Sequence, residues 1–227
     1  MRINYIGISL IACAMVVWMA CGKDEPVVTQ DTTPYILEIG HFPPPLLPQD
    51  NLPTEAGVKL GRMLFYEKAL SKDGSIACAD CHQQKDMFAD IRLFSIGVDQ
   101  LPGRRQAMPV FNLAWHIRGF FWDGRVTTLR EQALHPIQDP LEMNESLENV
   151  VARLDEQKIY QDQFTRAFGT PDVTADRIGL AIEQFELTIV SVDSKYDRFL
   201  AGHEQLSPAE ERGRVLFFQN ADPLNGI

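Results

Sequence analysis

The feature that most constrains this chain is a short cysteine–histidine motif, Cys78-Ala79-Asp80-Cys81-His82. A C-x-x-C-H pattern indicates covalent attachment of a c-type haem. Two thiols one helical turn apart can each add to a vinyl group on the same edge of the porphyrin, and the residue that follows is then placed to bind the iron. The motif therefore predicts Cys78 and Cys81 as the attachment residues and His82 as the proximal ligand.

Two other interpretations of the motif fit the sequence less well. A thioredoxin-like redox pair would lie near a βαβ pattern, and the chain has none. A structural zinc site needs four ligands, and the chain has no second Cys/His pair to complete one. Of the four cysteines, only Cys78 and Cys81 belong to the part of the chain that we expect to fold.

The N-terminus has the pattern of an export signal. A short, positively charged start is followed by an apolar stretch, residues 6–19, that is too short to span a bilayer comfortably. Cys21 follows and resembles the lipid-attachment cysteine of bacterial lipoproteins. We therefore expect residues 1–20 to be a signal peptide and Cys21 to carry lipid, which makes the protein an exported periplasmic or outer-membrane lipoprotein of a Gram-negative bacterium. Simple cleavage and release into the periplasm is the alternative.

The charge balance limits the partners. The chain has a formal net charge of −10, and its one notable basic cluster is Arg104-Arg105. Because phosphate binding needs a surface of lysine and arginine, we expect no nucleic-acid partner. The 45% apolar and 23% charged content is typical of a soluble globular protein, so any membrane contact would be made through the lipid anchor alone.

Helical patterns begin after a proline-rich start. Residues 21–51 are rich in proline and favour an extended tether or strap over the surface. Thr54 then precedes a predicted helix over residues 55–66 as its capping residue. The apolar residues expected on the buried face of this helix are Val58, Leu64 and Phe65.

Three further helix starts are predicted by capping residues. Asn144 and Thr174 each precede apolar residues at helical spacing, and Ser207-Pro208-Ala209-Glu210 has the form of a capping box. The buried stripe expected after Thr174 consists of Ile178, Ala181, Ile182, Phe185 and Ile189. No segment offers a clean period-two alternation. The predicted class is therefore all-α, with long loops at residues 71–77 and 86–125.

A haem alone does not distinguish an electron carrier from an enzyme. A carrier usually fills both axial positions of the iron, and Met87, Met108 and Met143 are candidates for the second position, although methionine is more often a packing residue. His116 precedes an aromatic run, and we expect it to be buried or hydrogen-bonded rather than a ligand. The histidines without a motif, interpreted as surface or loop residues, are His41, His135 and His203.

Further segments make the chain resemble the bacterial di-haem cytochrome c peroxidase family, which includes the MauG-like enzymes. The resemblance runs from about Leu52 to Ile227 and rests on LGRMLFYEKALSKDGSIACADCH, FNLAW, FFWDGR, LREQALHPIQDPLEM and DSKYDRFLAG. It implies two stacked cytochrome c-like domains, each with a haem c. In that family the N-terminal haem meets peroxide, and the C-terminal haem supplies it with electrons.

The resemblance also implies roles for individual residues. The cysteine–histidine motif would hold the haem at which peroxide reacts, Trp122 would lie between the two haems, and Gln132 and Glu142 would line the distal pocket. A carboxylate there can act as general base and then as general acid, and an amide can orient peroxide without changing charge. Without the resemblance, Gln132 and Glu142 would be interpreted as a helix-face and a surface residue. Glu131, which neighbours Gln132, is the competing carboxylate.

Two positions depart from the family pattern. Val98, in the segment SIGV, stands where many members have a histidine that blocks the resting iron. Because valine cannot bind iron, we expect a haem that is five-coordinate or water-ligated at rest and needs no reductive activation. Gln106 stands where members often have an asparagine that helps to bind Ca²⁺ between the domains. Its carbonyl oxygen suits that ion, so Gln106 remains a candidate calcium ligand.

The end of the chain repeats an earlier pattern. GRVLFFQNA, from Gly213, matches GRMLFYEKA, from Gly61, which leads into the haem motif. The corresponding cysteine would fall three residues past Ile227. We therefore expect residues 52–203 to be the N-terminal peroxidatic domain and residues 204–227 to be the start of a second haem domain, whose haem lies in the missing part. A decayed second domain that leaves one docking helix is the alternative.

The expected function is the reduction of hydrogen peroxide to water by a haem c peroxidase, with electrons from a small protein such as a cytochrome c or a cupredoxin. The alternatives are a MauG-like oxidase that acts on a protein or another substrate, a one-haem electron carrier without turnover, and a haem-bearing sensor or structural lipoprotein. Family members often dimerise, so the resemblance also allows a homodimer.

Overall fold

The computed structural model describes residues 27–219 of the 227-residue chain. The predicted signal peptide, the predicted lipid site at Cys21 and the segment 220–227 lie outside the described residues. The described part contains helices and isolated β-bridges but no named strand, so the predicted all-α class is confirmed. None of its helices is long and apolar enough to cross a membrane.

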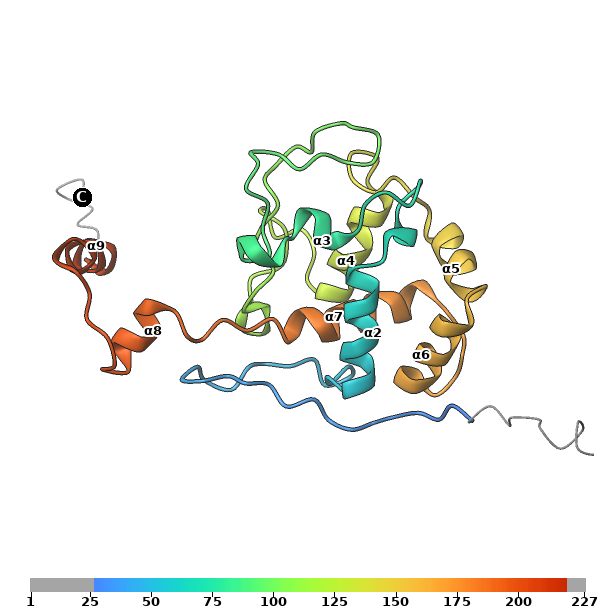
Figure 1. The fold of residues 1–227 in the computed structure, drawn as a ribbon, viewed down its shortest axis with the longest axis horizontal. Helices are drawn as coiled ribbons and strands as arrows, with labels where there is room; N and C mark the ends of the chain where they lie inside the picture. The colour runs from blue at the N-terminus through green and yellow to red at the C-terminus, as the bar shows by residue number, and fades with distance from the viewer. Residues whose placement is uncertain (1–26, 220–227) are drawn as a thin grey trace, which may run out of the picture.

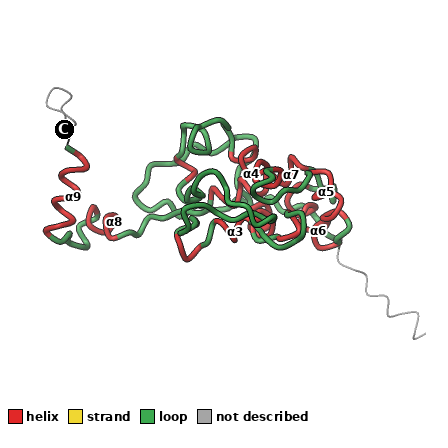
Figure 2. Tube along the Cα trace, turned by 90° about the horizontal axis from the view of Figure 1, so that it is seen from above, coloured by secondary structure: helices red, strands yellow, loops and turns green. Residues whose placement is uncertain are grey.

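The helices form one body and an arm. Helices α2, α4 and α7 cross near the centre of the body, α5 and α6 lie on one side of it, and α8 and α9 follow on a segment that projects away (Figure 1). The second view shows the same projection of α8 and α9 (Figure 2). The helices in chain order, with 3₁₀ turns written η, are α2 (Glu55–Phe65), η1 (Lys68–Leu70), α3 (Cys78–Cys81), η2 (Gln84–Asp86), η3 (Leu113–Trp115), α4 (Leu129–Gln138), α5 (Leu147–Asp155), α6 (Lys158–Phe168), α7 (Ala175–Leu187), α8 (Lys195–Leu200) and α9 (Pro208–Phe218).

The core of the body lies where α7 packs against α2 and α4. Glycines allow these helices to approach closely. A Cβ atom at Gly61 of α2 would lie 1.8 Å from the carbonyl oxygen of Ala181, and one at Gly179 of α7 would lie 2.6 Å from that of Arg130. The residues expected in the α7 stripe are all buried, and burying each large aliphatic side chain contributes about 1.5–3 kcal/mol to folding.

Most of the predicted helix caps are confirmed. The side chains of Thr54, Thr174 and Ser207 each accept a hydrogen bond from a backbone N–H of the first turn that follows. The predicted cap at Asn144 is wrong, because α5 begins later and Ser146 accepts the N–H of Asn149 at 3.1 Å. Asn144 instead has a φ of 50° in the preceding turn, a conformation that asparagine tolerates better than most residues.

An extended strap, residues 27–51, runs along the body before α2 begins (Figure 1). It is held at its end by Asn51, which is 6% exposed. The amide nitrogen of Asn51 donates to Glu183 Oε2 at 2.7 Å and to the carbonyl oxygen of Leu180 at 3.0 Å, and its amide oxygen accepts from Gln184 at 2.7 Å. The strap is therefore attached to the central helix.

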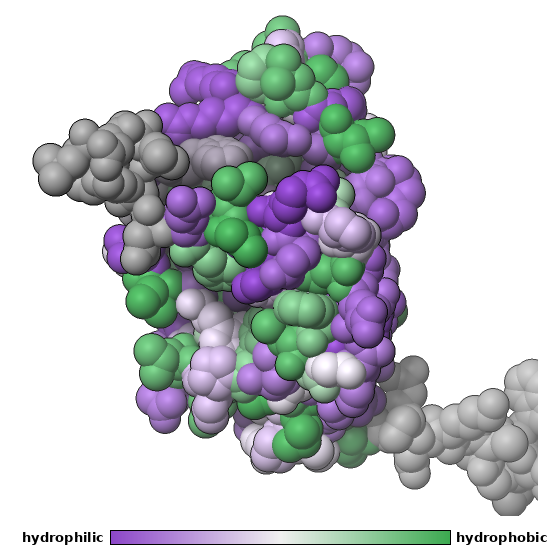
Figure 3. Space-filling model, turned by 90° about the vertical axis from the view of Figure 1, so that its left-hand side faces the viewer, coloured by the Kyte–Doolittle hydropathy of each residue, from purple (hydrophilic) through white to green (hydrophobic). Residues whose placement is uncertain are grey.

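The arm carries an apolar surface. Leu216, Phe217 and Phe218 of α9 are all exposed, with Phe217 at 83%. Seen from the α9 end, the molecule presents hydrophobic and hydrophilic residues intermixed (Figure 3). The exposed α9 residues therefore differ from the buried stripe of α7, although both helices begin with a well-formed cap.

Candidate functional site

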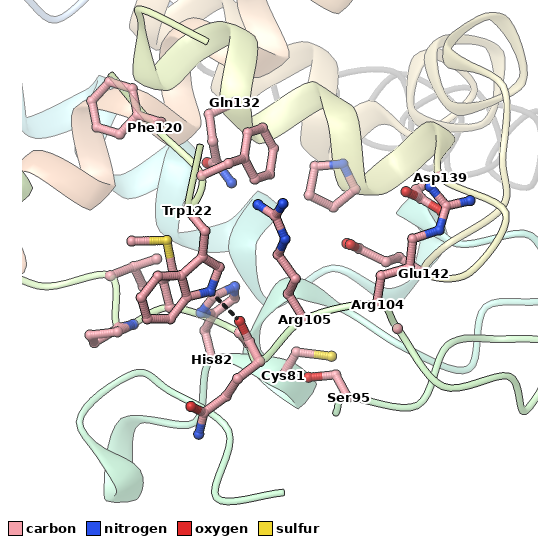
Figure 4. A pocket seen from close by; sticks show the side chains of 18 of the residues that line it. Cys81, His82, Ser95, Arg104, Arg105, Phe120, Trp122, Gln132, Asp139 and Glu142 are labelled. Atoms are coloured by element: carbon pink, nitrogen blue, oxygen red, sulfur yellow. Dashed lines mark hydrogen bonds between the residues drawn. The ribbon is translucent and has the colours of Figure 1, made fainter. Parts of the chain in front are cut away.

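A cavity of about 720 Å³ lies between the end of α3, the long loop 95–125, and α4 with the turn that follows it. Its volume falls in the range of small-molecule and cofactor sites. Side chains far apart in the sequence line it together, among them Cys81, His82, Gln132 and Glu142 (Figure 4). The structure thus brings the predicted attachment motif and the predicted distal residues to one place.

Helix α3 presents the two cysteines. Asp80 Oδ2 accepts the backbone N–H of Ala77 at 2.8 Å, and the N–H of His82 donates to the carbonyl oxygen of Cys78 at 2.8 Å, so the motif forms one closed turn. Both thiols are free and partly buried. Burial raises the pKa of each thiol, and the neighbouring Glu186 raises that of Cys78 further. A redox-active pair needs an accessible thiolate, so this environment disfavours the thioredoxin-like interpretation.

His82 is oriented by the loop that follows it. Its Nδ1 lies 3.0 Å from the carbonyl oxygen of Phe88. Because a carbonyl oxygen can only accept, this contact favours the tautomer in which Nδ1 carries the proton. Burial lowers the pKa of the imidazole, while the backbone carbonyls of Phe88 and Met108 act in the opposite direction. A neutral imidazole held by a backbone carbonyl is the usual arrangement of a metal-binding histidine.

The distal residues come from α4 and the turn after it. Gln132 lies on α4, and Glu142 lies in a turn closed by its own N–H donating to the carbonyl oxygen of Asp139 at 2.9 Å. Burial, followed by repulsion from Asp139, raises the pKa of Glu142 to about 7, and Arg125 acts in the opposite direction. A carboxyl group with a pKa near 7 can both take up and release a proton at neutral pH.

The loop containing Val98 is hydrogen-bonded to this turn. The N–H of Val98 donates to the carbonyl oxygen of Glu142 at 2.8 Å, and a Cβ atom at Gly97 would lie 2.1 Å from the carbonyl oxygen of Leu141. Val98 itself is 6% exposed and does not line the large cavity, whereas Ser95, Ile96 and Gly97 do. The position therefore holds the backbone of the carboxylate turn.

The other candidate axial ligands differ in whether they line the large cavity. Met108 and His116 line the large cavity, and His116 Nε2 lies 2.7 Å from the carbonyl oxygen of Gly119, as expected for a hydrogen-bonded residue. Met87 is 71% exposed, and Met143 is a buried core residue. The histidines expected at the surface, His41, His135 and His203, are exposed.

Trp122 and Gln106 meet at the edge of the cavity. The indole Nε1–H of Trp122 donates to the carbonyl oxygen of Gln106 at 3.0 Å, and the indole is 59% exposed (Figure 4). The side-chain nitrogen of Gln106 donates to the carbonyl oxygen of Asp90 at 3.1 Å. The described residues contain no group of three or more His, Cys, Asp or Glu arranged for a metal ion, and Gln106 stays a predicted calcium ligand.

Glu186 is a site residue that sequence reasoning missed. It is 4% exposed on α7, and burial, followed by repulsion from Glu183, raises its pKa to about 8. Its Oε2 atom is buried without a hydrogen-bond partner among the described residues. With Cys78, His82 and Glu142 it lines a second cavity of about 40 Å³. Its sequence position could have predicted this burial, because Glu186 follows Ile182 of the buried stripe by four residues, about one helical turn.

These features define the class of the protein. A helical body with a C-x-x-C-H turn, an oriented neutral histidine and a cofactor-sized cavity fits a c-type haem domain, because both thiols and the imidazole converge on one space. The family model described as "Di-haem cytochrome c peroxidase" matches residues 55–205. The chain belongs to the di-haem cytochrome c peroxidase family, and membership implies haem c as the cofactor.

Individual relatives agree with the family. The chain is 37% identical over 171 residues to the methylamine utilization protein MauG of Methylophilus methylotrophus, covering 75% of this chain and 51% of MauG. It is 35% identical over 206 residues to the cytochrome c peroxidase Ccp of Escherichia coli K12, covering 89% and 43%. A solved MauG-like protein associated with microbial copper homeostasis superposes with a TM-score of 0.74 at 35% identity, covering 81% and 55%. The chain thus spans about half the length of the relatives it matches.

Proposed function

We propose that this chain forms the peroxide-reacting part of a haem c peroxidase that reduces hydrogen peroxide to water. The observation that carries the proposal is one cavity with an oriented, neutral His82 at one wall and Gln132 and Glu142 at another. The raised pKa of Glu142 supports a proton-transfer role that a surface carboxylate would not have.

The overall reaction consumes one hydrogen peroxide, two electrons and two protons, and releases two waters. A bound haem would supply the redox chemistry that breaks the O–O bond, with Cys78 and Cys81 holding it and His82 binding its iron. Gln132 can orient peroxide by accepting and donating hydrogen bonds. Glu142, when ionised, can accept a proton from one peroxide oxygen and then give it to the oxygen that leaves as water.

Electrons would reach the cavity past Trp122, whose indole is fixed at the cavity edge by Gln106. We propose a small redox protein, a cytochrome c or a cupredoxin, as their origin, through a second haem domain. The export predicted from residues 1–20 and Cys21 agrees with covalent haem attachment, which takes place outside the cytoplasm.

The proposal includes the resting state. Val98 is an aliphatic residue buried behind Glu142, at the position where many relatives are expected to carry a blocking histidine. The resting ferric protein should therefore give the spectrum of a five-coordinate or water-ligated haem. A spectrum with only a low-spin, six-coordinate haem would contradict this part of the proposal, and Met108 and His116 would then be the residues to replace.

A MauG-like oxidase is the second candidate, supported by the similarity to MauG. The two functions share the same cavity and differ in where the electrons come from. Peroxide consumption that needs an added reductant and yields only water supports the peroxidase. Peroxide-dependent oxidation of a protein substrate without added reductant supports the oxidase.

The test uses the full, haem-loaded chain with a small-molecule reductant. Glu142→Gln should lower kcat/KM for peroxide by about 10²–10⁴-fold, the usual contribution of a general acid–base group. Glu131→Gln is the matched control, since Glu131 is an exposed carboxylate on α4 and should leave the rate unchanged. Equal rates for the wild type and Glu142→Gln would refute the role of Glu142.

A further inference from the structure

Three arginines line the cavity of this otherwise acidic chain. Arg104, Arg105 and Arg125 all belong to its lining, and all three are exposed, so they stand at its open side. Arg105 projects from the loop into the space between Trp122 and the wall that carries Glu142 (Figure 4). A net charge of −10 makes such a concentration of cations noteworthy, because it is the opposite of the chain's average surface.

Two of these cations share one carboxylate. Arg105 Nη1 lies 3.2 Å from Asp123 Oδ2, and Arg125 Nη1 donates to both carboxylate oxygens of Asp123, at 2.9 and 3.2 Å. The guanidinium carbon of Arg125 also lies 3.7 Å from the centre of the Phe121 ring. Two guanidinium groups against one carboxylate leave positive charge uncompensated. Because these ion pairs are about half exposed, they contribute little stability and can be exchanged for another anion.

The surroundings of Cys78 are poorly suited to anions. Cys78 packs against both main core clusters, and the smaller cavity beyond it is lined by Glu142 and Glu186. Burial disfavours ionisation of both carboxyl groups, so a further carboxylate placed there would be desolvated and would meet acidic side chains. The exposed arginines are therefore the groups of the lining best suited to bind a carboxylate.

A haem also has an apolar edge and an anionic edge. Its vinyl groups and its two propionate carboxylates lie on opposite edges of the macrocycle, and the thiols of Cys78 and Cys81 would hold the vinyl edge beside the buried core. We propose that Arg105 and Arg125, held by Asp123, bind the propionate carboxylates of the haem at the open end of the cavity. Guanidinium groups suit this role because they form paired, charge-assisted hydrogen bonds with carboxylates. The inference rests on the proposed haem attachment.

Arg105 has an alternative role, which is to act on peroxide instead of on the propionates. A cation that reaches into the cavity can also act on peroxide. Arg125 lowers the pKa of Glu142, so kinetics alone would mix an effect on the haem with an effect on the carboxylate. The decisive readout therefore has to report on the propionates themselves. The propionate bending band in the resonance Raman spectrum does so, because its frequency depends on hydrogen bonds to the carboxylates.

The experiment compares Arg105→Leu, Arg125→Leu and Arg105→Lys with Arg118→Leu. Arg118 is a matched control, since it is an exposed arginine of the same loop but does not line the cavity. Haem is first counted by mass spectrometry of each full-length protein. The propionate band and the midpoint potential are then measured on the loaded proteins.

Both leucine variants should shift the propionate band to lower frequency and lower the midpoint potential, because a positive charge near the haem disfavours the ferric state. Arg105→Lys should retain most of the potential but still shift the band, since lysine keeps the charge and lacks the paired donors. If a leucine variant fails to take up haem, the band of Arg105→Lys decides the question.

A band and a potential equal to those of Arg118→Leu in all the cavity variants would overturn the propionate assignment while leaving the haem site intact. Slower reaction with peroxide in Arg105→Leu, with an unchanged band, would overturn it in favour of a cation that acts on peroxide. A wild-type protein without covalent haem would overturn both this inference and the proposed function.

Discussion

The two walls of the cavity are built in different ways. The helical wall is α4, which packs on α7, and α7 packs in turn on α2. This helical core rests on fully buried side chains such as Leu60 and Ile182 and on close helix contacts at glycines. The loop wall, residues 84–125, leaves Ile91 and Leu93 about three-quarters exposed and holds most of the non-glycine residues with positive φ. The helical wall is thus the more tightly packed of the two, and the loop wall carries the exposed rim of the cavity.

The largest difference between the walls should appear in haem attachment. Replacing Cys78 and Cys81 together by serine, next to the helical core, should abolish covalent haem completely, because no thiol remains to form a thioether bond. His116→Ala, on the loop wall, should leave one haem attached. Mass spectrometry of the purified proteins reads both outcomes, and covalent haem in the double-serine variant would show that the motif has another role.

The second largest difference between the two walls should be in the free energy of unfolding that a truncated side chain costs. Ile182→Ala removes a side chain that is 1% exposed in the core and should lower the free energy of unfolding by about 2–5 kcal/mol. Leu93→Ala, at 76% exposure, should change it by less than about 0.5 kcal/mol. Urea unfolding of the two variants measures the difference, and similar losses would mean that the loop wall is packed as firmly as the helices.

The pH dependence of stability should also come from the helical core, through Glu186 on α7. Because the folded-state pKa of Glu186 is raised to about 8 from an ordinary 4.5, its contribution is fully present below pH 4.5 and is lost as the pH rises towards 8. One such group makes stability fall by at most about 1.4 kcal/mol per pH unit within that window. Glu186→Gln should remove this slope and leave a smaller one, ending near pH 7, from Glu142. An unchanged slope would show that Glu186 is ionised in the folded protein.

Replacing Asp50 in the strap should have the smallest effect on the free energy of unfolding. Asp50 makes a bidentate but exposed ion pair with Arg130, at 2.7 and 3.0 Å, so Asp50→Asn should lower the free energy of unfolding by no more than about 1 kcal/mol. Asn51→Leu is the matched change one residue away, and it should be clearly more harmful because it strips a buried partner from Glu183 and Gln184. Equal effects would mean that burial of the strap end contributes nothing.

The same contrast explains what the sequence could predict. Helix starts at Thr54 and Thr174 and the stripe of α7 follow from local rules, capping and 3.6-residue periodicity, and these are confirmed. Asn144 misled the prediction because a capping residue looks the same in sequence whether the helix begins one residue or three residues later. The true cap, Ser146, is distinguished by its extended backbone and by the hydrogen bond that its side chain accepts from the N–H of Asn149.

The residues of the candidate site also differ in whether local sequence or tertiary packing determines their position. The cysteine–histidine motif is local, so its spacing alone is enough to predict haem attachment. The placement of Gln132 and Glu142 beside His82 depends on packing between α4, the turn after it and α3, and it was expected only through the family resemblance. No role was predicted for Glu186 or Arg125, and Arg105 was noted only as part of a basic cluster, because their places beside the cavities depend on tertiary packing.

The most direct test of the central claim, that Glu142 moves protons for peroxide bound opposite His82, is the rate constant for the reaction of the haem-loaded protein with peroxide from pH 5 to 9. In the wild type it should rise roughly tenfold per pH unit below about pH 7 and then level off, because the carboxyl must be ionised to accept a proton. In Glu142→Gln it should be low and independent of pH in this range. The same profile in both proteins would contradict the claim.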